Sequence, residues 1–89
     1  MAQKLTLSEP EQRVLRAILH QSMISGAKLL NYMGMTRPND LITIVRNLVH
    51  LNLIEASGDF LDEKMFPYAT FGTRPSAREY LTALLKEQP

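Results

Sequence analysis

The spacing of apolar positions divides this 89-residue chain into four helical stretches and one stretch with β-strand character. Apolar side chains recur three or four residues apart within 8–21, 26–33, 38–51 and 74–87, which is the spacing of an amphipathic helix. Residues 53–72 combine alternation with turn signals and predict a β-hairpin. A chain of this length supports one modest core. The sequence therefore predicts a single domain of the α+β class.

Local signals set the ends of the first two helices. Ser8 and Glu11 have the spacing of a capping box, so the first helix is expected to begin there, after a short arm formed by residues 1–7. Ser25 is the expected N-cap of the second helix. Gly34 is expected to end that helix, because glycine tolerates the left-handed conformation that a helix end requires.

The third helix is predicted to follow the tight turn at 34–37. Pro38 suits its first turn, where a missing N–H costs nothing, and Thr36 or Asn39 is the expected cap. The outer face of this helix is expected to be polar and free of carboxylates: Asn39, Thr43, Arg46, Asn47 and His50. A helix-turn-helix reads base edges in the major groove with such side chains. An ordinary solvated helix has a similar face, so the periodicity alone leaves both interpretations open.

The β-prone stretch is expected to form two strands joined by a loop. One strand is predicted within Leu53 to Ser57 and the return strand within 67–72, with Gly58 opening the loop between them. Met23 and Ile24 are expected to add a short strand before the second helix.

The order of these elements resembles the winged-helix domains of small bacterial transcriptional regulators of the MarR, ArsR and PadR types. Two runs carry the resemblance: AKLLNYMGMTRPNDLITIVRNLVHLNLIEAS (27–57) and TFGTRPSAREYLTALL (70–85). It implies a winged helix-turn-helix with a three-helix core, a wing of two or three strands and a C-terminal helix. Those families usually have glycine where this chain has Asn52. Asparagine also visits the left-handed region, so the turn is expected to survive.

The resemblance implies that the third helix (38–51) is the recognition helix of a double-stranded DNA-binding protein. Arg46 can bridge guanine O6 and N7, Asn39 and Asn47 can pair with adenine, and Thr43 can contact thymine. His50 completes the predicted base contacts. The predicted phosphate contacts lie on the second helix and at the entry to the third: Lys28, Tyr32 and Arg37.

The composition of the predicted wing does not favour DNA binding. Wings that touch DNA commonly carry Arg or Lys at the tip, whereas residues 58–66 contain Asp59, Asp62 and Glu63 against Lys64. An acidic tip repels phosphate. The alternative is therefore a winged-helix module that binds a protein partner through its acidic, apolar wing and does not bind DNA.

Composition excludes several other functions. The chain has no cysteine, and its formal net charge is +1. His20 and His50 do not stand at a metal-ligand spacing, and no glycine-rich phosphate loop is present. Neither a catalytic centre, a metal site nor a cofactor is expected. No apolar run approaches the roughly 20 residues of a membrane span, so the expected location is cytoplasmic.

The last predicted helix carries a wide apolar sector: Tyr80, Leu81, Leu84 and Leu85. A domain of this size is expected to leave part of that sector uncovered, which would favour a homodimer. The alternative is that the helix completes its own core.

Overall fold

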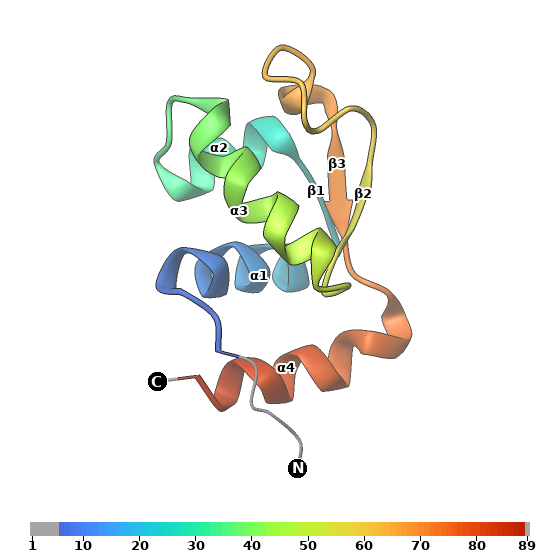
Figure 1. Cartoon of the computed structure of the whole chain (residues 1–89). Coiled ribbons are helices and arrows are strands. Elements are labelled where there is room, and N and C mark those ends of the chain that lie inside the picture. Colours follow the sequence, from blue (N-terminus) through green and yellow to red (C-terminus); the bar gives the residue numbers. More distant parts are fainter. Residues whose placement is uncertain (1–5, 89) are drawn as a thin grey trace.

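The computed structural model describes residues 6–88, which form four α-helices and a small antiparallel sheet (Figure 1). The elements are α1 (Glu9–Gln21), β1 (Met23–Ser25), α2 (Gly26–Met33), α3 (Pro38–His50), β2 (Glu55–Ser57), β3 (Thr70–Gly72) and α4 (Arg78–Lys86). Two 3-10 turns, η1 (Phe66–Tyr68) and η2 (Pro75–Ala77), flank β3. The expected α+β class is confirmed.

The sheet has the order β1-β3-β2, and both pairings are antiparallel. Phe71 in the central strand faces Ile24 on one side and Ala56 on the other. The connection from β2 to β3, residues 58–69, is called the β2–β3 loop below. In Figure 1 this loop and α4 lie at opposite ends of the molecule.

The core joins the helices to the sheet through fully buried side chains. Val14, Leu15 and Ile18 of α1 and Leu41, Val45 and Leu48 of α3 supply its helical part. From the sheet side, the rings of Phe66 and Phe71 lie 5.5 Å apart between centroids. Their burial removes a large apolar area from water and ties the β2–β3 loop to the rest of the domain.

The local signals in the sequence act as predicted at four positions. Ser8 and Glu11 make both hydrogen bonds of the capping box, and the Ser25 hydroxyl accepts from the Lys28 N–H. Gly34 ends α2 at φ 67°, and Asn52 adopts φ 59° in the turn after α3. Asn52 therefore fills the left-handed position in which the resembled families have glycine.

The cap predicted for α3 and the start predicted for the last helix are wrong. Arg37 occupies the N-cap of α3 without a side-chain hydrogen bond, because the residue before Pro38 is restricted to extended backbone. Arg74 is likewise extended before Pro75, and the 3-10 turn η2 follows. Helix α4 consequently begins at Arg78 rather than at 74, and no side chain caps it.

Two residues expected outside the core belong to it. Leu7, assigned to an arm, is buried; its N–H donates to Gln88 Oε1 and its carbonyl accepts from Gln12 Nε2. Residues 1–5 of that expected arm lie outside the described part of the chain. Phe66, expected in the exposed loop, is 0% exposed, because the η1 turn points its ring at Phe71.

Candidate nucleic-acid interface

The polar face of α3 is open to solvent along the helix. Leu41, Val45 and Leu48 fix the orientation of α3 by packing into the core. All of the side chains predicted to contact bases are exposed: Asn39, Thr43, Arg46, Asn47 and His50. The amphipathic pattern alone accounts for this arrangement.

These side chains differ in their hydrogen bonds. The Thr43 hydroxyl donates to the Asn39 carbonyl of the preceding turn, which occupies its only proton. The Asn47 amide donates to the Glu11 carboxylate of α1. The side chains of Asn39, Arg46 and His50 form neither a hydrogen bond nor an ion pair with another residue of 6–88, so their donors and acceptors are open to a ligand.

The contact of Glu11 with α3 is a feature that sequence reasoning missed. Burial raises the pKa of its carboxyl, but hydrogen bonds from the Ser8 backbone, the Asn47 amide and the Ser8 hydroxyl outweigh burial and leave that pKa below its ordinary value of 4.5. The carboxylate lines a 350 Å³ hollow beside Arg46 and His50. The expectation of a face free of carboxylates is wrong. Exposed Asp40 stands in the first turn of α3, on the same side of the helix as Asn47, and α1 places Glu11 at the edge of the face.

The predicted phosphate contacts are also exposed. Lys28 and Tyr32 lie on α2, and Arg37 stands at the entry to α3. The turn that Gly34 begins joins the two helices, so these side chains and the α3 face belong to consecutive elements. A cationic side chain at such a position can hold a phosphate without reading sequence.

The β2–β3 loop is compact and acidic. Asp62 closes its turn, because its carboxylate accepts from the Lys64 N–H and its carbonyl accepts from the Phe66 N–H. The end of the loop is held to α2 by a 2.8 Å hydrogen bond from the Gly26 N–H to the Ala69 carbonyl. Between these fixed points the loop exposes apolar side chains, with Leu61 at 56% and Met65 at 46%.

The sector of α4 expected to remain uncovered is mostly core. Leu81, Leu84 and Leu85 are buried, and α4 packs against α1. Only Tyr80 of the predicted dimer residues stays on the surface, at 58% exposure. The leucines of the sector therefore belong to the core beside α1, and only the Tyr80 edge of the sector remains uncovered.

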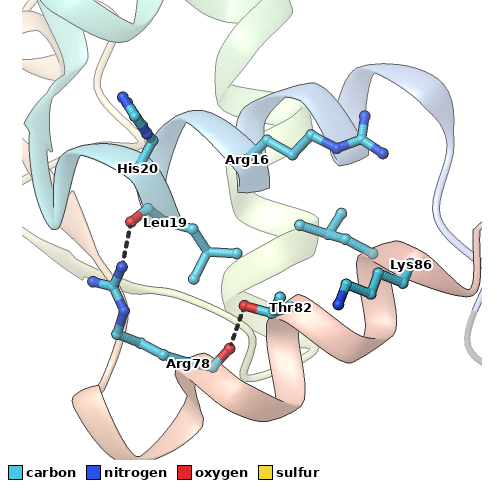
Figure 2. Close-up of a pocket in the computed structure, with 7 residues that line it drawn as sticks. Arg16, Leu19, His20, Arg78, Thr82 and Lys86 are labelled. Atoms are coloured by element: carbon cyan, nitrogen blue, oxygen red, sulfur yellow. Dashed lines mark hydrogen bonds between the residues drawn. The ribbon is translucent and has the colours of Figure 1, made fainter.

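A groove between α1 and α4 is a second feature that sequence reasoning missed (Figure 2). It has a volume of 420 Å³ and is lined by Arg16, Leu19, His20, Arg78, Thr82, Leu85 and Lys86. Arg78 joins the two helices, since its guanidinium donates to the Leu19 carbonyl at 3.0 Å near the end of α1. The two residues are 59 positions apart in the sequence, so no local sequence pattern predicts this contact.

No group of three His, Asp or Glu side chains within residues 6–88 is placed to hold a metal ion. In the same part of the chain, no helix is both long and apolar enough to cross a membrane. Comparisons with protein-family models, with curated proteins and with solved structures found no match to this chain.

Proposed function

We propose that this chain is a winged-helix domain that binds double-stranded DNA as a small transcriptional regulator, with α3 in the major groove and the β2–β3 loop as its wing. The main support for the proposal is the exposed polar face of α3, on which Arg46 forms no hydrogen bond or ion pair with another described residue. A helix of this width fits the major groove, and its Arg and Asn side chains match base edges there.

The contacts differ in what they contribute. Arg46 supplies bidentate recognition of guanine. Asn39 is exposed in the first turn of α3 and pairs with adenine, while Asn47 does so only after its amide leaves Glu11. Lys28 and Arg37 bind phosphates, which set register and orientation without carrying sequence information.

The first prediction concerns Arg46 and Arg37. Arg46→Ala is expected to lose about 1–3 kcal/mol of affinity for the selected duplex and to flatten the preference for it over random DNA. Arg37→Ala should weaken binding to all duplexes alike. Fluorescence anisotropy on both duplexes measures these losses. Arg16→Ala is the matched control, because it removes the same charge from the exposed side of α1.

Two results would contradict this assignment. One is an equal loss for Arg46→Ala and Arg16→Ala, which would mean that only net charge matters. The other is an Arg46→Ala protein that keeps its full preference for the selected duplex. Circular dichroism of each variant separates lost contacts from lost folding.

A protein-interaction module is the second candidate, and the β2–β3 loop favours it. The loop combines exposed Asp59 and Glu63 with exposed Leu61 and Met65, a surface that repels phosphate and suits a protein. Salt dependence separates the two functions. Several phosphate contacts give an affinity for random duplex that falls steeply with salt, whereas an interaction module binds random duplex hardly at all.

A further inference from the structure

The groove between α1 and α4 is positively charged around an apolar floor. Arg16, Arg78 and Lys86 carry permanent charge, His20 adds a titratable ring, and no carboxylate is among the lining residues. Leu19 and Leu85 form the floor. The one salt bridge within residues 6–88 joins Arg74 to Glu55, so no acidic side chain of the described chain forms an ion pair with a cation of the groove.

The charges are spread along the groove rather than gathered at one point. In Figure 2, Arg16 and His20 extend in different directions from α1, and Lys86 lies on the facing helix. Two nitrogens of Arg78 are already engaged, one with the Leu19 carbonyl and one with the Ser22 hydroxyl. A compact anion is held best by donors that converge on it, whereas separated cations along a groove match an extended acidic segment.

The β2–β3 loop has the complementary surface. Asp59 and Glu63 are exposed and their carboxylates form no hydrogen bond or ion pair with the rest of 6–88, while Leu61 and Met65 present apolar side chains beside them. The loop thus carries acidic and apolar groups, and the groove carries cations and a leucine floor. Opposite potentials and matched apolar surface together define a specific contact.

The two surfaces lie at opposite ends of the molecule (Figure 1), so a chain cannot fill its own groove with its own loop. We infer that the β2–β3 loop of one copy docks in the α1–α4 groove of a second copy. The contact is heterologous, because two different surfaces meet, and every copy keeps one free loop and one free groove. Association therefore continues head to tail unless the rotation between copies closes a ring.

This self-association is tested separately from the proposed DNA binding. Among the described residues, none of α3 lines the groove, while the loop contacts α3 through η1 and is the wing of the proposed function. The contact is measured without DNA, so its failure leaves the proposed function untouched, and failure of DNA binding leaves the contact untouched.

Sedimentation equilibrium of the full chain tests the inference. The weight-average mass is expected to rise continuously above the 10.1 kDa monomer as concentration increases from about 10 µM to about 1 mM, the range of a small, polar contact. Added salt should reduce the mass at each concentration, because it screens the charges.

Two charge-reversed variants remove one surface each. D59K/E63K changes the loop and spares Asp62, whose carboxylate closes the loop turn. R16E/K86E changes the groove and spares Arg78, which holds α4 to α1. Both proteins should stay monomeric. The matched control is R13E, which reverses an exposed charge of α1 that does not line the groove, and it should associate like the unmodified chain.

Mixing the two variants is the decisive experiment. Each charge-reversed protein retains one native surface, but the two altered surfaces are also opposite in charge. An equimolar mixture should therefore regain association that neither protein shows alone, and D59K/E63K/R16E/K86E should associate by itself. A monomer at all concentrations would overturn the inference, as would a fixed dimer or association that survives in either variant. Circular dichroism confirms that each variant is folded.

Discussion

Glu11 shows how one side chain serves two contacts. Its carboxylate closes the capping box of α1 by accepting the Ser8 N–H, and it also accepts the Asn47 amide from α3. Both hydrogen bonds favour the ionised form and keep the pKa of this carboxyl below its ordinary value. The native chain therefore binds this proton less tightly than the unfolded chain does, and ionisation of Glu11 favours folding.

Glu11→Gln should change how stability depends on pH. The contribution of the charge is present above pH 4.5 and disappears as pH falls through the lowered pKa of the folded state. At pH 7 the variant should be less stable by about 0.5 kcal/mol, the size of a charge effect at a helix N-terminus. Urea unfolding at pH 7 and near pH 3 should show that difference shrinking. A constant difference at both pH values would contradict it.

Substitutions at Asn52 test whether the turn after α3 requires a left-handed backbone conformation. At φ 59°, glycine should be at least as well tolerated as asparagine, while Asn52→Ala should lose about 1 kcal/mol because its Cβ opposes this conformation. Thermal unfolding of Asn52→Gly and Asn52→Ala measures both. Equal stability of the two variants would show that the turn relaxes out of the left-handed region.

At the level of elements, the start of α2 is fitted tightly against η1. Gly26 is buried and its N–H donates to the Ala69 carbonyl. A Cβ at Gly26 would overlap the carbonyl oxygen of Phe66 and lie 2.9 Å from its carbonyl carbon. Backbone atoms cannot turn aside as a side chain does, so only a hydrogen atom fits between α2 and the end of the β2–β3 loop.

Gly26→Ala is expected to destabilise the domain by about 2–3 kcal/mol, because α2 and η1 must separate. The matched control is Gly34→Ala, where φ is 67° but no atom lies within 4 Å of the added Cβ. That change should cost about 1 kcal/mol from conformation alone. Urea unfolding compares them. A smaller loss for Gly26→Ala than for Gly34→Ala would contradict the close approach.

At the level of the whole molecule, α4 belongs to the intramolecular core. Leu85 is 8% exposed and packs with the α1 side of the core, whereas Tyr80 points outward. Leu85→Glu should destabilise the monomer by at least about 2 kcal/mol, because a carboxylate replaces buried apolar surface. Tyr80→Glu should change stability by less than about 0.5 kcal/mol. Thermal unfolding of the two variants measures both effects. A fully stable Leu85→Glu protein would show that Leu85 lies on the surface.

Sequence by itself determined the features that depend on neighbours along the chain. The capping box at Ser8, the helix end at Gly34 and the turn at Asn52 follow from backbone angles and from hydrogen bonds a few residues apart. The apolar period of α3 also fixed which of its faces is exposed. The wrong cap of α3 and the late start of α4 also have a local cause, because the residue before a proline is kept extended whatever polar side chains stand nearby.

Only the tertiary structure decided which residues far apart in the sequence contact each other. The hydrogen bond from Asn47 to Glu11 spans 36 residues, and the one from Arg78 to the Leu19 carbonyl spans 59. Such pairs follow from the angles and distances at which whole helices pack, which no short window of sequence encodes. For the same reason the burial of Leu81, Leu84 and Leu85, and the basic groove beside them, emerged only when α1 and α4 were brought together by the core they share.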